Sequence, residues 1–366
     1  MMKVLVFGMT ENPGGVESVI MNYYRKIDKE KMQFDFLCNC RNVSYKDEIN
    51  SFGGRIYSIT SRRENFFLFK RELDMFMKEH ASEYDVIWVN LCSLVNIDYL
   101  ISAKKYGVRK RIIHCHNSDN DAGKIKGLIH EFNRKRIKRY ATDFWSCSSD
   151  ASKWFFEKEI IDGNNYKVLP NAIDINRFKQ DVKIRQAVRT ELGIKDKKVV
   201  GHVGRFHFQK NHKYLINIFE KLIQTDKNYH LLLVGQGELE DEIRELVNDK
   251  SLEKYVTFCG VHNDVEKYYQ AMDVFVLPSV FEGLAVVTLE AQANGLSCIF
   301  SCALPKIVKV NRNVSFLDLD EDTSQWESAI VQGMKAGRLS DAENCMEKSI
   351  FNINVQVNEF ERWLQE

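Results

Sequence analysis

The chain alternates short apolar runs with amphipathic stretches, and it does so twice over its 366 residues. The runs are rich in β-branched and aromatic residues, which is typical of strands buried on both faces. Strands that alternate with helices predict parallel sheets covered by helices. In the first half we expect strands at residues 4–7, 34–38, 55–59, 86–90, 111–116, 143–147 and 167–169. In the second half we expect them at residues 199–203, 231–234, 256–258, 274–277 and 298–300.

Helices are predicted wherever apolar residues recur with a helical period between these strands. In the first half the clearest examples are residues 66–78 and 125–140. Within 125–140 the apolar residues fall mostly on one stripe, namely Ile125, Leu128, Ile129, Phe132 and Ile137. In the second half we expect helices at about residues 211–224, 238–248, 264–271, 284–294 and 355–364.

Two such runs, each of about 170 residues, predict an α/β protein with two Rossmann-like domains. We place the boundary near Pro170–Asp174, which gives a first domain of residues 1–172 and a second of residues 173–350. Residues 351–366 are expected to form a C-terminal helix that packs back on the first domain. Ligands of such sheets bind beyond the carboxyl ends of the strands, so we expect the site in the crevice between the domains.

The apolar runs are too short to cross a bilayer, which takes roughly 20 residues, and the N-terminal run is predicted to be a first strand and not a signal peptide. The nine cysteines are an odd number without Cys-x-x-Cys spacing. Reduced thiols in a cytoplasmic protein are therefore expected.

Charge is distributed unevenly, although the net charge is only +1. Between Lys104 and Arg139 there are 12 basic and three acidic residues. Such a segment can contact nucleic acid, anionic lipid headgroups or a lipid-diphosphate acceptor, or it can be a solvated helix face. We expect no nucleic-acid partner and consider an anionic membrane surface, which would place the protein peripherally at the inner face of the cell membrane.

The stretch from Glu282 to Glu290 follows the strand at 274–277 and leads into a helix that stops at Asn294-Gly295. Eight helical residues would rise about 12 Å and return both carboxylates to nearly one face. That rise is close to the span from the sugar to the ribose of a nucleotide sugar. A helix N-terminus between the carboxylates would favour a diphosphate. A sugar-nucleotide site is the first hypothesis, although a glutamate at a helix start can also be only a cap charge.

Two cations stand where the second domain begins. Arg205 is predicted at the tip of the strand at 199–203, and Lys210 at the start of the next helix. We expect both to point toward the crevice and neutralise a diphosphate, Arg205 with a planar fork and Lys210 as a point charge. The alternative is a pair of surface cations.

Taken in order, the motifs of the chain resemble those of glycosyltransferase family 4. In the second half these are Gly204-Arg205, Lys210-Asn211, Leu232–Gly237, Val256–Gly260, Ala271–Ser279, Phe281–Leu284 and Glu290-Ala291. In the first half they are a glycine loop at Asn12–Glu17, a histidine segment at Ile112–Ser118 and an interdomain motif at Leu169–Asp174. The family has the GT-B fold, with two Rossmann-like domains that face each other across a cleft. The resemblance covers nearly the entire chain and is nearest to bacterial transferases that build capsular polysaccharide or exopolysaccharide.

The resemblance implies donor contacts in the second domain. Glu290 would hold the ribose hydroxyls, and Glu282 would lie beside the donor sugar near its anomeric carbon. Arg205 and Lys210 would contact the diphosphate. Backbone N–H groups would add further phosphate and sugar contacts, at Gly283, Leu284 and Ala285. Position 285 is alanine where the family often has proline.

The resemblance also implies contacts from the first domain. Gly14 and Gly15 would let their loop approach the same phosphates, although Pro-Gly-Gly is also an ordinary turn. His116 would lie on the acceptor side near the reacting carbon, or it is a buried structural histidine. Because His114 and His116 alternate, we expect them on opposite sides of the strand end, and hence no metal pair.

The implied activity is that of a retaining, metal-independent hexosyltransferase. The donor would be a nucleoside-diphosphate sugar, by analogy UDP-sugar, and the acceptor a growing, lipid-linked glycan. No cofactor and no metal site are expected, and the acidic stretch Asp318-Leu319-Asp320 is predicted to be an exposed loop. Alternatives are a sugar-nucleotide epimerase or phosphorylase on the same fold, or a catalytically silent sugar-binding partner subunit. The complete Glu282/Glu290 and Arg205/Lys210 sets argue against a silent subunit, and no pyridoxal-lysine motif is visible.

Overall fold

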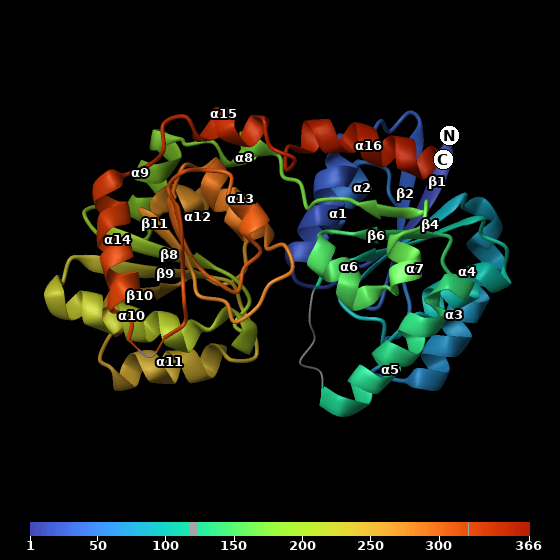
Figure 1. Cartoon of the computed structure of the whole chain (residues 1–366), viewed down its shortest axis with the longest axis horizontal. Helices are drawn as coiled ribbons and strands as arrows, with labels where there is room; N and C mark the ends of the chain where they lie inside the picture. The colour runs from blue at the N-terminus through green and yellow to red at the C-terminus, as the bar shows by residue number, and fades with distance from the viewer. Residues whose placement is uncertain (118–122, 321) are drawn as a thin grey trace. The chain divides into compact units, whose positions relative to one another are not determined.

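The computed structural model describes residues 1–117, 123–320 and 322–366. The chain divides into two units, which are described separately (Figure 1). Unit 1 comprises Met1–Ala172 and Ile353–Glu366, and unit 2 comprises Ile173–Asn352. Each unit contains one parallel sheet with helices around it, which confirms the predicted α/β class with two Rossmann-like sheets.

The sheet of unit 1 has seven strands in the order β3-β2-β1-β4-β5-β6-β7. Strand β1 pairs in parallel with β2 on one side and β4 on the other, so Val4 lies between Phe34 and Val86. The strand order reverses beside β1, and ligands of such sheets bind beyond the carboxyl ends at this point. The strands are β1 (Met2–Phe7), β2 (Met32–Cys38), β3 (Ile56–Ser58), β4 (Val86–Leu91), β5 (Lys110–Cys115), β6 (Asp143–Ser146) and β7 (Tyr166–Val168).

The C-terminal helix α16 belongs to unit 1. Phe360 of α16 lies 4.5 Å from Tyr23 of α1 and 4.9 Å from Trp88 of β4, measured between ring centroids. This aromatic cluster attaches the last helix to the first sheet. The helices of unit 1 are α1 (Gly15–Lys26), α2 (Lys46–Ser51), α3 (Phe66–His80), α4 (Asp98–Lys105), α5 (Gly123–Arg136), α6 (Ser149–Phe155), α7 (Lys158–Ile161) and α16 (Ile353–Gln365).

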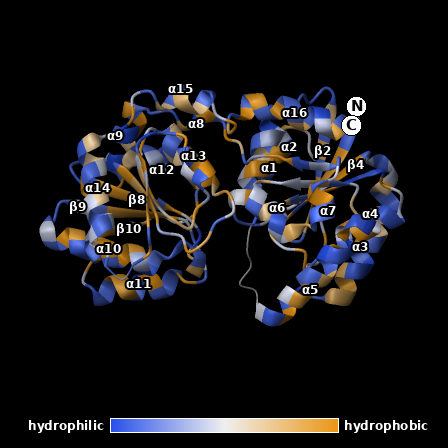
Figure 2. Ribbon diagram, in the orientation of Figure 1, coloured by the Kyte–Doolittle hydropathy of each residue, from blue (hydrophilic) through white to orange (hydrophobic). Residues whose placement is uncertain are grey.

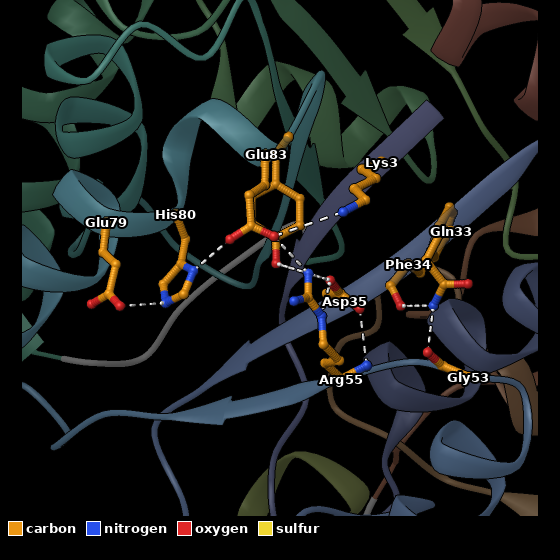
Figure 3. A network of polar contacts seen from close by, with 10 residues as sticks. Lys3, Gln33, Phe34, Asp35, Gly53, Arg55, Glu79, His80 and Glu83 are labelled. Carbon is orange, nitrogen blue, oxygen red and sulfur yellow. Dashed lines mark hydrogen bonds and ion pairs between the residues drawn. The ribbon is translucent and has the colours of Figure 1, made fainter. Parts of the chain in front are cut away.

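A polar network ties strands of unit 1 together near their amino ends (Figure 3). The buried Asp35 carboxylate of β2 accepts hydrogen bonds from Arg55, which precedes β3, and from Tyr84, which precedes β4. The same guanidinium contacts Glu83 at 2.9 Å, and Glu83 also contacts His80 at 2.6 Å. The network therefore lies away from the carboxyl ends, where a ligand is expected.

The sheet of unit 2 has six strands in the order β10-β9-β8-β11-β12-β13. Its strand order reverses between β8 and β11. The strands are β8 (Lys198–Val203), β9 (Tyr229–Val234), β10 (Val256–Phe258), β11 (Val274–Leu277), β12 (Ser297–Ser301) and β13 (Val314–Leu317). The sequence did not predict β13. The helices are α8 (Ile175–Phe178), α9 (Val182–Glu191), α10 (His212–Thr225), α11 (Glu240–Asp249), α12 (Glu266–Ala271), α13 (Val286–Ala293), α14 (Ser324–Ala336) and α15 (Ala342–Glu347).

Both faces of this second sheet are buried. On one face, α10, α11 and α14 cover strand residues such as Val200, Leu231 and Val274. On the other face, Tyr269 of α12 packs on Phe275 of β11 with ring centroids 5.7 Å apart. The strands are accordingly the most hydrophobic elements in Figure 2. Within the described ranges of the chain, no helix is both long and apolar enough to cross a bilayer.

Candidate functional site

The main chains of the loops that follow β8 and β9 are in close contact, because glycines in the second loop have no side chain to keep them apart. Gly235 has a φ of +138°, and a methyl group there would lie 2.1 Å from the Gly204 carbonyl oxygen. A methyl group on Gly237 would lie 2.4 Å from the Phe206 carbonyl oxygen. The Gly204 N–H donates to Val234 at 2.9 Å. The carboxyl end of this sheet therefore presents main chain to whatever binds there.

Lys210 and Glu282 meet at this edge of the sheet. Lys210 Nζ lies 2.6 Å from Glu282 Oε1, with 16% of the lysine and 7% of the glutamate side chain exposed. Gln209 donates to the other carboxylate oxygen at 3.1 Å, and its carbonyl accepts the Val280 N–H at 2.8 Å. These contacts join the loop after β8 to the loop after β11, and they fix where the carboxylate lies.

The helical span predicted from Glu282 to Glu290 is wrong. Helix α13 begins at Val286, and its N-cap residue Ala285 is extended, with φ −69° and ψ 110°. Gly283 favours helix poorly, and the Glu282 side chain is held by the loop after β8. The two glutamates are therefore not on one helix. Buried residues that precede the helix are Gly283, Leu284 and Ala285.

Glu290 is buried in α13 and has a specific partner. Its Oε2 atom accepts a hydrogen bond from the Tyr269 hydroxyl at 2.7 Å. Burial, and then the Glu290 carboxylate, hold the pKa of Tyr269 well above its ordinary value, so the hydroxyl stays a donor. Sequence reasoning missed Tyr269 because nothing in its short helix distinguishes a functional hydroxyl from a core aromatic ring.

Arg205 lies in the loop after β8 but makes a different contact from Lys210. Its guanidinium is 3.0 Å from the Glu238 carboxylate, and 69% of its side chain is exposed. His207 lies 3.5 Å from the same carboxylate. The structure thus brings Lys210 and Glu282 into direct contact, while Arg205 and Glu290 each have another partner.

A buried histidine pair supports this loop, and it was not predicted from the sequence. His202 of β8 is fully buried, and its Nδ1–H donates to the Val276 carbonyl at 2.8 Å. Its ring centroid lies 4.6 Å from that of His212, which in turn stacks on Phe206. Burial, with a smaller effect from Lys210, lowers the pKa of His202 to about 4. Burial therefore outweighs the hydrogen bond to Val276, which by itself would raise the pKa, and His202 stays neutral near Lys210.

In unit 1, His116 lies just beyond β5 and is buried. Its Nε2 atom is 2.9 Å from Asn90 Oδ1, and Asn90 donates its amide to the Phe7 carbonyl at 3.1 Å. Because the Asn90 amide nitrogen faces Phe7, its oxygen faces the imidazole and accepts a hydrogen bond from His116 Nε2–H. Burial lowers the pKa of His116 to about 3, against an opposing hydrogen bond with Asn171. The imidazole is therefore neutral near pH 7.

The expectation that His114 and His116 face opposite sides is wrong. Their ring centroids are 4.1 Å apart. Residues two apart along a strand point to the same face, and His116 keeps this direction beyond the strand end. Within residues 1–117, 123–320 and 322–366, no group of three or more His, Cys, Asp or Glu side chains is arranged to hold a metal ion.

Gly14 and Gly15 begin helix α1, where Glu17 occupies the cap. The Glu17 carboxylate accepts the Gly14 N–H at 3.1 Å and the Thr10 hydroxyl at 2.5 Å. A methyl group on Gly14 would lie 2.8 Å from that carboxylate, whereas one on Gly15 would meet nothing within 4 Å. Within unit 1, the glycine at position 15 is therefore not required by packing.

Two family models match the chain. The model of Glycosyltransferase Family 4 matches residues 13–177, and that of Glycosyl transferases group 1 matches residues 197–335. A Bacillus subtilis (strain 168) protein named as the glycosyltransferase EpsF is 33% identical over 337 residues, which cover 89% of this chain and 86% of EpsF. The chain belongs to glycosyltransferase family 4. Its match to EpsF includes most of both units.

Other relatives of this family-4 glycosyltransferase carry more specific names. CapH of Staphylococcus aureus, a capsular polysaccharide biosynthesis glycosyltransferase, is 23% identical and covers 98% of this chain and 97% of its own. An Escherichia coli UDP-Gal:alpha-D-GlcNAc-diphosphoundecaprenol alpha-1,3-galactosyltransferase is 28% identical over 57% of this chain and 61% of its own. The crystal structure of Anabaena HepE with UDP and glucose aligns over 100% of both chains, with a TM-score of 0.83 and 19% identity. This last likeness shows the GT-B fold.

Proposed function

We propose that this glycosyltransferase retains the anomeric configuration and moves a hexose from a UDP-sugar to a growing, lipid-linked polysaccharide. The observation that carries the proposal is the contact of Lys210 with Glu282 at the carboxyl end of the second sheet. UDP is the nucleotide in the HepE crystal and in the name of the E. coli relative, which also names alpha-D-GlcNAc-diphosphoundecaprenol. CapH supports polysaccharide synthesis as the setting.

In this proposal the leaving diphosphate is stabilised by cations and by main chain. The Lys210 ammonium has three N–H groups, so it can bind Glu282 and a phosphate oxygen at once. The exposed Arg205 guanidinium can exchange Glu238 for a phosphate oxygen. Helix α13 begins without an acidic residue in its first turn, so its dipole adds to the same field. Two cations with a helix N-terminus supply the neutralisation that a divalent metal provides in other transferases.

The glutamates bind the two ends of the donor. Glu282, held by Lys210 and Gln209, accepts hydrogen bonds from hydroxyls of the transferred sugar. Glu290 keeps the Tyr269 hydroxyl as a donor on one carboxylate oxygen and receives the ribose hydroxyls. Main-chain N–H groups at Gly283, Leu284 and Ala285 complete the contacts. Neither glutamate forms a covalent bond with the sugar.

Transfer then needs an acceptor hydroxyl on the face from which the phosphate departs. The hydroxyl oxygen forms the new bond to the anomeric carbon as the bond to the phosphate oxygen breaks, and the leaving phosphate takes the hydroxyl proton. His116, neutral and oriented by Asn90, positions the acceptor. Gly14 and Gly15 bring a second loop to the diphosphate.

The setting that we propose is the cytoplasm, with peripheral attachment to the inner face of the membrane through residues 104–139. This segment carries the positive charge that attracts anionic headgroups. Such attachment would bring the enzyme to a lipid-linked acceptor.

A donor screen tests the function. The purified protein is incubated with UDP-, GDP- and TDP-sugars, with and without lipid-diphosphate-linked acceptors, and free nucleotide and sugar products are measured. The proposal predicts acceptor-dependent UDP release with an α-linked product from an α-linked donor. Donor isomerisation without net nucleotide release would indicate an epimerase, and no turnover with any donor would indicate a silent subunit.

A further inference from the structure

Helix α5 is attached to unit 1 with three residues of its apolar stripe directed into solvent. Ile125, Leu128 and Phe132 are 76%, 73% and 61% exposed. They are spaced by three and four residues, so they share one face of the helix. An apolar stripe on a helix of a globular domain ordinarily faces the core, whereas here only its end at Ile137 is buried and these three residues face away. Figure 2 shows the hydrophobic residues on this helix.

Polar side chains hold α5 in this orientation. His130 Nδ1 accepts the Leu94 N–H at 3.1 Å, and the Asn133 amide donates to the Leu94 carbonyl at 2.5 Å. The His130 ring also stacks on Trp154 with centroids 4.1 Å apart. Both His130 and Asn133 are buried. Rolling the helix to bury its apolar stripe would break these contacts, so the exposure is built into the unit.

Basic side chains surround the stripe. Residues 123–139 include seven Lys or Arg and a single acidic residue, Glu131. Arg134 contacts Glu131 and Glu157, and Arg136 lies over the Phe132 ring at 4.6 Å. The remaining basic residues of this segment have no ion pair with any carboxylate of the described residues; they are Lys124, Lys126, Lys135, Lys138 and Arg139.

A second exposed apolar element is connected to the same loop through Arg62. The start of α3 exposes Phe67 at 82%, next to Phe66, whose ring lies under Arg62. Arg62 donates to the Val95 carbonyl at 2.8 Å. The neighbouring residue in that loop, Leu94, is the one that α5 binds. Arg62, which precedes α3, therefore links the start of that helix to the loop that anchors α5.

We propose that α5 is an interfacial helix that inserts Ile125, Leu128 and Phe132 into the surface of an anionic bilayer, with the flanking lysines and arginines on the headgroups. The proposal rests on the membrane attachment proposed above and names the element that makes it. A narrow apolar face bordered by Lys and Arg is the pattern of helices that lie in the bilayer interface. The strong excess of basic residues complements an anionic surface, whereas an apolar interface with a second protein would need no such excess.

Co-sedimentation with vesicles tests the proposal on the full chain. The vesicles are phosphatidylcholine alone or with 30% phosphatidylglycerol. The test variant combines Ile125→Ser, Leu128→Ser and Phe132→Ser, and the charge variant combines Lys124→Ser, Lys126→Ser and Lys135→Ser. The control combines Val182→Ser and Val355→Ser, whose side chains are 56% and 52% exposed on other helices.

We expect the wild type and the control to bind anionic vesicles equally. The apolar variant should bind at least about tenfold more weakly at both low and high salt, because fewer apolar groups enter the interface. The charge variant should lose about fivefold per lysine at low salt and much less at high salt. UDP release with a water-soluble acceptor should be unchanged in every variant, which separates this inference from the proposed transfer reaction.

Two results would overturn the inference. If the apolar variant binds vesicles as tightly as the wild type, another element attaches the protein. If vesicle binding is unchanged and sedimentation velocity shows that only the apolar variant has lost a dimer, the stripe is an interface between copies of the chain.

Discussion

Lys210 Nζ lies 2.6 Å from Glu282 Oε1, although the two residues are 72 positions apart in the chain. The contact joins the loops that follow β8 and β11 where the strand order of the second sheet reverses. The cation that we assign to the leaving diphosphate and the carboxylate that we assign to the sugar are therefore in direct contact. The pair is a structural element and, in our proposal, a catalytic one, and these two contributions can be separated.

Removing one charge of this pair should destabilise the protein. Lys210→Met and Glu282→Gln should each lower the free energy of unfolding by about 3 kcal/mol, because each leaves the other charge buried without its partner. The double variant should lose less than the sum of the two. Urea unfolding measures all three. Lys213→Met, at a largely exposed pair with Glu242, is the control and should change stability by less than about 1 kcal/mol. Additive losses would show that the pair does not interact.

Tyr269 should matter for donor affinity through Glu290. Tyr269→Phe removes the 2.7 Å hydrogen bond and leaves Glu290 less well oriented. Loss of a hydrogen bond to a carboxylate costs about 1.5 kcal/mol or more, so the donor KM should rise about tenfold with kcat nearly unchanged. Tyr268→Phe removes a hydroxyl that contacts His262 and should leave the donor KM unchanged. Equal KM values for the two variants would remove Glu290 from the donor site.

A substitution at Gly15 tests donor binding without disturbing the packing of unit 1. Gly15→Ala places its methyl group in open space, and alanine favours helix over glycine by up to about 1 kcal/mol, so stability should hold or rise. If Gly15 lies close to the donor phosphates, the donor KM should nevertheless rise. Gly14→Ala pushes Glu17 from the cap and should cost about 1 kcal/mol of stability. An unchanged KM in Gly15→Ala would show that the donor does not approach this loop.

Acid should weaken the network at the amino ends of the first sheet. The hydrogen bond from His80, and then that from Arg55, lower the pKa of Glu83 from 4.5 to about 2. A carboxyl whose pKa is lower in the folded state stabilises the protein above pH 4.5, and this contribution disappears as the pH falls toward 2. The stability difference between wild type and Glu83→Gln should shrink over that range. Glu79→Gln, at a side chain that is 76% exposed, should show no such trend. A pH-independent difference would contradict the assignment.

The strands could be predicted because parallel strands buried on both faces are nearly continuous apolar runs. The strands Val256–Phe258 and Val274–Leu277 have the predicted bounds. Strand β13, Val314–Leu317, was not predicted. The helical period of residues 125–140 was also clear. Which side of that helix meets the protein depends on Leu94, a distant residue whose main chain binds His130 and Asn133.

The contacts among the candidate site residues could not be predicted from the sequence. Arg205, Lys210, Glu282 and Glu290 were chosen from motif order, and the sequence could not show which of them touch. Glu282 was assigned to a helix because the local spacing of residues cannot reveal its contact with Lys210, which is distant in the chain. Tyr269 was missed because its partner, Glu290, is 21 residues away.

Nucleotide release by the double variant Lys210→Met/Glu282→Gln tests the central claim most directly. Neither charge is left unpaired in this variant, so it should be close to wild type in urea unfolding and comparable in a rate assay. With a UDP-sugar and a lipid-diphosphate acceptor, our account predicts that UDP release falls at least about 100-fold, because both the leaving-group cation and the sugar carboxylate are lost. A folded double variant that releases UDP at the wild-type rate would contradict the account.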